Sequence, residues 1–479
     1  MHIHSLDLAI VVVYLLGVTA LGVYFRRTQH GVRDYFLGGR TTPWWALALS
    51  IVATETSTLT IIGTPAIAYA GNLTFIQWVF GYLLGRVLVS AFFLPGYFRG
   101  DFLTAYGVIE RRFGQRMRSV AAITFLGTRT LAEGVRVAAI ALVVSVALGT
   151  SERLAVLIVI VLTIFYTFEG GMKAVIWTDV AQFLLYLLGS IITFAVLLHR
   201  IPGGWSEVTQ VAAVHGNKLQ FLDFSSNLAT KYTFWSGIIG GAFLTMASHG
   251  TDQTIVQRLL AAKNQRDSRR ALLASGFIVL FQFVIFLLVG VLLFVFAQRS
   301  PLLTPGDRTD SILPIFLVRE MPSGLTGVLL ASILAVAMSN ASGSLNSLAA
   351  SSVVDFAGLR DDKSDTSTFL QRSRRMTLVW GAVLIGFGLL PWGHLLEAGL
   401  TVAALPFGSL LGLFLLGTFD PRANALGSLV GMFGGLICVL LVLGFTQVAF
   451  TWYVMIGSCV TFALGALVSR VVAQPAASS

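Results

Sequence analysis

Charged residues are scarce in this chain of 479 residues. They make up 11% of it, against about 25% in soluble globular proteins, whereas 56% of the residues are hydrophobic. A soluble chain of this length would form about three domains, but so little charge could not cover their surfaces. The composition therefore excludes a soluble multidomain protein and indicates one transmembrane domain over residues 1–479, all-α and surrounded by the lipid bilayer.

Cysteine and the common catalytic motifs are nearly absent as well. Cys438 and Cys459 both lie in apolar stretches, so the sequence offers no disulfide framework and no cysteine-based metal spacing. It contains no phosphate-binding glycine loop, no nucleophile elbow and no paired-histidine metal motif. We therefore expect a protein that is not an enzyme. Its formal charge of +10 is explained by basic loops beside a membrane, so we expect no nucleic acid and no obligate protein partner.

Long apolar runs fill most of the chain. A helix needs about 20 apolar residues to cross a bilayer, with a range of about 17–25. The sequence predicts thirteen spans, and no soluble domain fits between them. Their ranges are 8–25, 44–70, 75–98, 119–148, 154–168, 174–198, 234–255, 271–296, 325–354, 376–390, 395–416, 425–445 and 452–468.

Basic residues are distributed unevenly between alternate connections. If the N-terminus lies outside, the connections that face the cytoplasm carry 22 of the 32 lysines and arginines, and those on the other side carry 7. The remaining three, Arg86, Arg129 and Arg136, lie inside spans. Because cytoplasmic loops are enriched in Lys and Arg, the bias predicts an outside N-terminus and a cytoplasmic C-terminus. We expect an integral protein of a bacterial inner (plasma) membrane.

The second span, 44–70, is interrupted by a polar run at 54–60. At membrane depth, polar backbone and side chains are tolerated where they face protein or line a water-filled cavity. Unwinding near Ala53 and Thr56 would free carbonyl oxygens, which are ligands for a small hard cation. The alternative is a kinked helix whose threonine hydroxyls bond back to their own turn.

The ninth span could supply a partner for this break. Ser339, Ser342 and Asn346 recur at i, i+3 and i+7 and therefore share one helix face. A helix face that is rich in hydroxyl and amide oxygens and carries no charge suits a monovalent cation, which must bind and then dissociate. The alternative is ordinary helix packing, which also favours small and hydroxyl residues in membranes.

Three charges form a stripe on the fourth span. Arg129, Glu133 and Arg136 lie at i, i+4 and i+7, and a charge at the bilayer centre costs about 2.5–3.5 kcal/mol on insertion scales. If Glu133 pairs with one arginine, the other is available to a carboxylate through bidentate hydrogen bonds. Alternatively, all three pair and extend toward the cytoplasmic end of the helix. Arg86 has no partner at helical spacing.

Short motifs follow one another in a fixed relation to the spans. They are residues 34–40 after the first span, 104–106 and 110–114 before the fourth, 170–175 with Trp177-Thr178-Asp179 and Gln182 at the sixth, Asp252-Gln253 with Gln257-Arg258 after the seventh, and 339–347 in the ninth. In this order they resemble the sodium/solute symporter family, which includes proline, pantothenate, sialic acid, iodide and sugar carriers.

The resemblance implies a LeuT-type five-plus-five inverted repeat. The first repeat would cover 44–198 and the second 234–416, with an extra N-terminal helix at 8–25 and two extra C-terminal helices over 425–468. The first helix of each repeat would be broken at the midplane. In the second repeat that helix is the seventh span, which carries Gly237, Gly240, Gly241 and Gly250.

The resemblance also implies a Na+ site. By matching positions, the ligands are the carbonyls of Ala53, Thr56 and Val336 and the side chains of Ser339 and Asn340. Asn340 departs from the family, where Ser or Thr is usual, and its amide oxygen would coordinate instead. A possible second sodium site would use Asp179 and Ser342, although Gly343 replaces a hydroxyl residue there.

Family members that carry anions use arginine or tyrosine on the fourth span, so the resemblance favours Arg136 and Arg129 as solute contacts. Ser57 and Thr60 are further candidates, and Glu55 occupies a position that is acidic in the proline carriers. We therefore predict a sodium-coupled secondary active symporter that imports a small polar organic solute, with a carboxylate as the candidate bound group, by alternating access. The alternatives are a proton-coupled carrier that uses Glu55 or Asp179, and a solute-gated channel or sensor with a transporter-like fold.

Overall fold

The computed structural model describes residues 4–25, 37–100, 102, 104–148, 150–303, 308–353, 366–390, 392 and 395–472, and its regular structure there is helical. One isolated parallel bridge joins Thr42 to Ala262. The start of the motif at 34–40 and the last residue of the predicted ninth span lie outside the described residues. The all-helical class predicted from composition is confirmed for the described part.

The helices follow the predicted spans closely at most positions. They are α1 (Ser5–Phe25), η2 (Gly38–Arg40), α3 (Trp44–Glu55), α4 (Thr58–Ala70), α5 (Ile76–Phe92), α6 (Leu94–Arg99), α7 (Tyr106–Phe113), α8 (Gln115–Leu148), α9 (Glu152–Arg200), α10 (Gly204–Val214), η3 (Ser236–Gly240), α11 (Gly241–Gly250), α12 (Gln253–Leu260), α13 (Gln265–Ala297), η4 (Thr309–Ser311), α14 (Ile312–Glu320), α15 (Leu325–Ser351), α16 (Thr366–Gly388), α17 (Leu395–Phe419), α18 (Ala425–Phe445), η6 (Phe450–Trp452) and α19 (Tyr453–Val471).

Within the described residues, seven helices are long and apolar enough to cross a membrane, or eight if the bent pair α3 and α4 counts as one crossing. These helices make the chain an integral membrane protein of the helical class. The count of thirteen remains a prediction, because several predicted spans are shorter or more polar than this criterion requires.

Connections assigned to the cytoplasm meet at one end of the molecule. The bridge between Thr42 and Ala262 joins the connection after the first span to that after the seventh. Arg112, at the end of α7, donates to the carbonyl of Asp420 at 2.9 Å. Arg470, at the end of α19, lies 3.5 Å from the Asp420 carboxylate. All these connections belong to the same predicted side.

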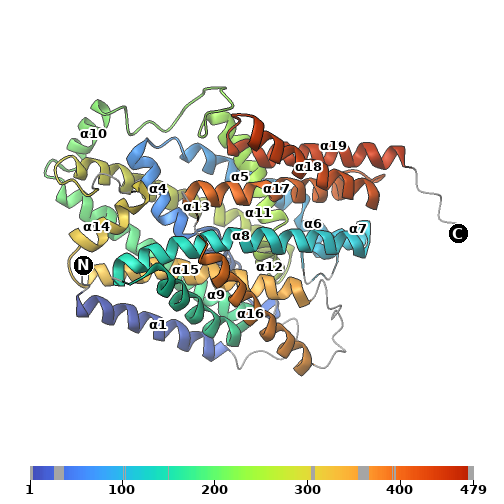
Figure 1. The fold of residues 1–479 in the computed structure, drawn as a ribbon, viewed down its shortest axis with the longest axis horizontal. Coiled ribbons are helices and arrows are strands. Elements are labelled where there is room, and N and C mark those ends of the chain that lie inside the picture. Colours follow the sequence, from blue (N-terminus) through green and yellow to red (C-terminus); the bar gives the residue numbers. More distant parts are fainter. Residues whose placement is uncertain are drawn as a thin grey trace.

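Connections assigned to the outside meet at the opposite end. Arg200 and Glu320 form an ion pair of 2.9 Å, and the Asp7 carboxylate accepts from the backbone N–H of Gly324 at 2.6 Å. Figure 1 shows the start of α1 with α10 and α14 at one end of the long axis, and α7 at the other. The structure therefore agrees with the alternation of sides that the charge count assumes.

α9 covers both the fifth and the sixth predicted spans. Its 49 residues would measure about 73 Å as a straight helix, more than twice the roughly 30 Å of a bilayer core. A Cβ on Gly388 would lie 3.4 Å from Val156, near the start of α9, and a Cβ on Gly38 would lie 3.6 Å from Lys173 in its middle. Gly388 and Gly38 are predicted to lie on opposite sides of the membrane. The start and the middle of α9 therefore lie on opposite sides, which agrees with two antiparallel crossings.

α13 packs against both halves of the broken second span. A Cβ on Gly290 of α13 would overlap the carbonyl of Pro65 in α4 and lie 2.8 Å from the Ala68 Cβ. Glycine therefore allows the two backbones to approach closely, as small residues commonly do between membrane helices. This packing holds α4 at its angle to α3.

The predicted seventh span is divided differently from the expectation. It begins with the π-helical turn η3 over Ser236–Gly240 and continues as α11 to Gly250. The helix then ends, and the Asp252 side chain accepts from the Thr254 N–H to start α12. The interruptions thus lie near the two ends of α11, one in the glycine-rich turn and the other at a polar cap.

Candidate functional site

The second span breaks where the polar run predicts. α3 ends at Glu55, α4 starts at Thr58, and the two helices are bent by 66°. In a continuous helix the Ser57 N–H would donate to the carbonyl of Ala53, but it donates to Thr60 Oγ1 at 3.2 Å. Ser57 Oγ in turn accepts from the Thr60 N–H at 3.2 Å. This reciprocal cap starts a new helix and leaves carbonyls at the end of α3 without their usual partners.

α15 lies directly against the break. Asn340 Nδ2 donates to the carbonyl oxygen of Thr56 at 2.5 Å and to that of Val336 at 2.9 Å. The two oxygens therefore converge on one point, as the ligands of a small cation would. Asn340 is 2% exposed, so these bonds are protected from water. The two spans predicted to hold sodium are in contact at the predicted residues.

The side chain of Thr56 is held from the other side by α13. Gln282 Nε2 donates to Thr56 Oγ1 at 2.8 Å, and Gln282 Oε1 accepts from the Tyr186 hydroxyl at 3.1 Å. These buried bonds fix the residue whose carbonyl faces Asn340. Ala53 is fully buried at the same helix end, whereas the side chain of Ser339 lies outside the described part of the structure.

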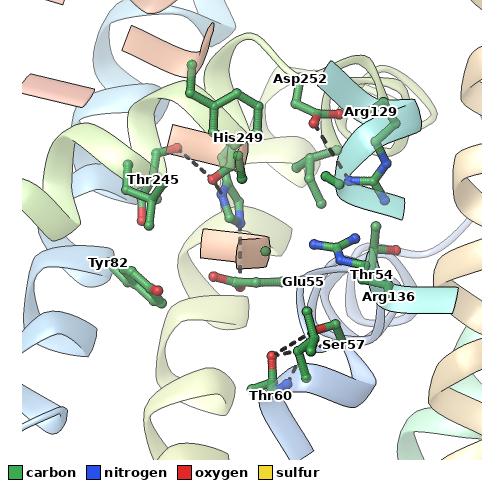
Figure 2. A pocket seen from close by; sticks show the side chains of 18 of the residues that line it. Thr54, Glu55, Ser57, Thr60, Tyr82, Arg129, Arg136, Thr245, His249 and Asp252 are labelled. Carbon is green, nitrogen blue, oxygen red and sulfur yellow. Dashed lines mark hydrogen bonds and ion pairs between the residues drawn. The ribbon is translucent and has the colours of Figure 1, made fainter. Parts of the chain in front are cut away.

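A cavity opens beside the break. Its volume is about 160 Å³, and part of it is open to solvent. The wall includes five side chains that the sequence singled out: Glu55, Ser57, Thr60, Arg129 and Arg136. Figure 2 shows them together with Tyr82, Thr245, His249 and Asp252.

The arginine stripe of α8 forms one wall of this cavity. Glu133 Oε2 lies 3.4 Å from Arg129 Nη2 and 3.3 Å from Arg136 Nη1. Arg129 also donates to Ser344 at 2.8 Å and lies 3.8 Å from the Asp252 carboxylate. Glu133 thus serves both arginines, instead of pairing with one and leaving the other free.

Arg136 is the more accessible of the two arginines. Its side chain is 21% exposed, against 8% for that of Arg129. Its Nη1 donates to Glu133 and to Asn340 Oδ1, both at 3.3 Å, and its Nε and Nη2 have no hydrogen-bond partner among the described residues. That edge of the guanidinium matches the two oxygens of a carboxylate.

Glu55, which also lines the cavity, belongs to a cluster of residues that the sequence alone did not connect. Glu55 forms an ion pair with Arg86 of α5 and lies 3.6 Å from His249 Nε2. Arg86, which lacked a partner by spacing, also donates to Ser275 at 3.1 Å. His249, near the end of α11, is 1% exposed and lines the cavity. Contacts between different helices cannot be predicted from the spacing of residues within one helix.

The possible second sodium site has a different environment from the one expected. Asp179 Oδ2 accepts from Arg258 Nη2 at 2.7 Å and from Ser50 Oγ at 2.5 Å, and Asp179 and Arg258 are fully buried. A Cβ on Gly343 would lie 2.9 Å from Arg258 Nη2. The guanidinium therefore fills the space that Gly343 leaves open, beside the carboxylate predicted to bind a cation. Ser342 is also buried on α15.

Within the described residues, no group of three or more His, Cys, Asp or Glu side chains could hold a metal ion. An alkali ion at the break would be bound by carbonyl, hydroxyl and amide oxygens. The convergence of the Thr56 and Val336 carbonyls fits this kind of site, because unwound membrane helices use such oxygens for Na+.

The chain is similar to known carriers over nearly its full length. It is 31% identical to a sodium/sialic acid symporter of Aliivibrio fischeri, covering 95% of this chain and 91% of that protein. It is 30% identical to a sodium/sialic acid symporter of Proteus mirabilis, covering 96% and 94%. The human sodium/iodide cotransporter is also 30% identical, over 90% of this chain and 68% of that protein.

Solved structures show the same fold. The substrate-bound, outward-open structure of a Na+-coupled sialic acid symporter matches with a TM-score of 0.89 and 29% identity, covering 98% of both chains. A nucleobase-cation-symport-1 family transporter matches with a TM-score of 0.62 at 14% identity, over 91% of this chain and 94% of that one, which shows the fold alone. Residues 35–435 match the model of the sodium:solute symporter family. The chain belongs to the sodium:solute symporter family and is a transporter, not an enzyme.

Proposed function

We propose that this protein is a sodium-coupled symporter that imports a small polar organic anion by alternating access. The observation that carries the proposal is the contact between the broken second span and α15 at Asn340, next to a cavity that Arg136 lines. The break offers converging carbonyl oxygens to a cation, and the arginine offers a free edge to a carboxylate. Similarity to a relative named for sialic acid and to the human sodium-coupled monocarboxylate transporter 1, which is 31% identical over 87% of this chain and 69% of that protein, supports the same solute class.

Sodium would bind between the carbonyls of Ala53, Thr56 and Val336 and the side chains of Ser339 and Asn340. The solute would bind in the cavity, with its carboxylate at Arg136 and Arg129. Its polar groups would face Ser57, Thr60 and Glu55. Since both ligands bind where α3, α4, α8 and α15 meet, each would favour the state in which that junction is assembled.

We propose a single sodium ion per cycle. At the second candidate site Arg258 already supplies a positive charge to Asp179, 2.7 Å away. Sodium at Asp179 and Ser342 would have to displace a fully buried guanidinium, and an unpaired buried charge is strongly destabilising.

The same pairing argues against the proton-coupled alternative. Protonating Asp179 would leave Arg258 buried without a counter-charge, and protonating Glu55 would do the same to Arg86, whose side chain is 1% exposed. Both carboxylates are better suited to holding arginines in place than to carrying a proton through each cycle.

For the membrane arrangement we propose thirteen spans with an outside N-terminus and a cytoplasmic C-terminus in a bacterial inner membrane. Residues 44–198 and 234–416 would form the two inverted repeats, flanked by the helix at 8–25 and the two helices over 425–468. The agreement between predicted sides and observed contacts supports this arrangement.

Transport into proteoliposomes tests the proposal. Purified protein should take up radiolabelled sialic acid or lactate, in competition with a panel of organic acids, when an inward sodium gradient is imposed. Uptake should saturate with solute and collapse when choline replaces sodium or when a sodium ionophore is added. Uptake that follows an imposed pH gradient in the absence of sodium would instead support proton coupling, and non-saturating flux would indicate a channel.

A further inference from the structure

Asn340 connects the two places that the proposed function assigns to different ligands. On one side its Nδ2 donates to the carbonyls of Thr56 and Val336, at 2.5 and 2.9 Å. On the other side its Oδ1 accepts from Arg136 Nη1 at 3.3 Å. One side-chain amide therefore reaches from the proposed cation site to the proposed solute cavity.

The neighbours of Asn340 fix the orientation of its amide. Two carbonyl acceptors lie on the nitrogen side and a guanidinium donor lies on the oxygen side. Rotating the amide by half a turn would place Oδ1 against two oxygens and the N–H₂ group against N–H donors, so every bond would be lost. The N–H₂ group, which carries a partial positive charge, therefore occupies the place of a cation between these carbonyls.

Sodium needs the opposite orientation, because only the amide oxygen has lone pairs to offer. Rotation would cost the bond to Arg136 as long as that guanidinium stays in place. The two bonds of Arg136 Nη1, to Asn340 and Glu133, are both 3.3 Å long, whereas a carboxylate typically binds an arginine at about 2.7–2.9 Å. An anionic solute can therefore draw Arg136 toward the cavity and release the amide.

We propose that Asn340 couples the two ligands: its amide N–H₂ holds the cation place while Arg136 binds its oxygen, and it rotates to coordinate sodium when Arg136 engages the solute. This inference rests on the proposed function and deepens it. By linkage, whatever removes Arg136 from Asn340 raises the affinity for sodium. The inference therefore makes a prediction for sodium alone: a variant that has lost its solute-binding arginine should bind sodium more tightly.

The test measures the sodium concentration that half-saturates a thermal shift or a tryptophan fluorescence change of the purified full chain, without solute. Choline serves as the ionic-strength control. Arg136→Ala removes the donor to Asn340, and Asn340→Ser removes the amide while supplying a hydroxyl. Each should lower the half-saturating concentration roughly three- to tenfold, the effect of one or two hydrogen bonds.

Arg129→Ala is the matched control. It removes the same charge from the same helix and cavity wall, but Arg129 bonds to Ser344 and not to Asn340, so it measures the purely electrostatic gain. In an Asn340→Ser background, Arg136→Ala should add no more than this electrostatic gain, because coupled residues are not additive. Size-exclusion profiles identify any variant that fails to fold.

Two results would overturn the coupling role while leaving sodium symport intact. One is an equal gain in sodium affinity from Arg136→Ala and Arg129→Ala. The other is full additivity of the affinity gains from Arg136→Ala and Asn340→Ser in the double variant. A wild-type chain that ignores sodium even when sialic acid or lactate is present, while Asn340→Ser binds it, would support the role of Asn340 and contradict sodium symport. Absence of a sodium response in every variant would overturn both proposals.

Discussion

Arg136 is the single residue on which the identity of the solute depends most. Its side chain lines the cavity, and its Nε and Nη2 have no hydrogen-bond partner among the described residues, whereas its Nη1 is occupied by Glu133 and Asn340. Arg129 is held more firmly, by Ser344 and by two carboxylates. Of the two arginines, Arg136 can thus turn toward a bound anion with the smaller loss of protein contacts.

Arg136→Lys should weaken carboxylate binding by roughly ten- to a hundredfold. Lysine keeps the charge but cannot form two parallel bonds to a carboxylate, and a hydrogen bond to a charged group contributes about 1.5–3 kcal/mol. Isothermal titration of the purified protein with sialic acid or lactate at saturating sodium measures the change. Arg129→Lys is the matched control and should lose clearly less. Equal losses in the two variants would contradict the role given to Arg136.

The polar interruption and the hydroxyl-rich helix are visible in the sequence, and the resemblance to the family assigned Thr56 and Asn340 to a common site there. The two residues are in contact, but other pairs between helices were not predicted. Arg86 and His249 were not connected to Glu55, since they come from α5 and α11. Such pairs depend on how helices far apart in the sequence pack, which helical periodicity does not encode.

At the scale of elements, the polar run located the break in the second span within a residue or two. The reason is local: Ser57 and Thr60 cap each other, and such caps can be read from sequence. The interruptions of the seventh span were less predictable. Its four glycines serve close packing as well as a turn, so their presence did not show where the helix would end.

Gly81 of α5 shows how closely these elements pack. A Cβ at this position would overlap the carbonyl of Gly237 in η3 and lie 2.8 Å from Gly241 Cα and 2.9 Å from Ala242 N in α11. The neighbouring atoms are backbone and cannot move aside as a side chain would. The contact of α5 with η3 and α11 therefore requires glycine on both sides.

Gly81→Ala should lower the stability of the folded protein by about 1–3 kcal/mol, the usual cost of overpacking. Gly127→Ala in α8 is the control, because a Cβ there meets nothing within 4 Å and alanine has the better helix propensity, by about 1 kcal/mol. Melting temperatures of the two variants in the same detergent measure the difference. A Gly81→Ala variant as stable as Gly127→Ala would contradict the packing described for α5 and α11.

At the scale of the whole molecule, the contacts between connections divide them into two groups. Thr42 meets Ala262 and Arg112 meets Asp420 at one end, while Arg200 meets Glu320 at the other. A miscounted span would place downstream connections at the wrong end and produce contacts between predicted opposite sides. The charge count predicts the direction, because cytoplasmic loops are enriched in arginine and lysine.

Site-directed cysteine labelling in intact bacteria tests this direction. In a background that carries Cys438→Ser and Cys459→Ser, Ser226→Cys lies in the exposed connection before η3, and Lys263→Cys in the exposed connection between α12 and α13. A membrane-impermeant maleimide should label the Ser226→Cys variant in intact, outer-membrane-permeabilised cells, and the Lys263→Cys variant only after the inner membrane is opened. The reverse pattern would invert the protein in the membrane. Sodium would then reach the Thr56 and Val336 carbonyls from the opposite side, and the proposed inward transport would become export.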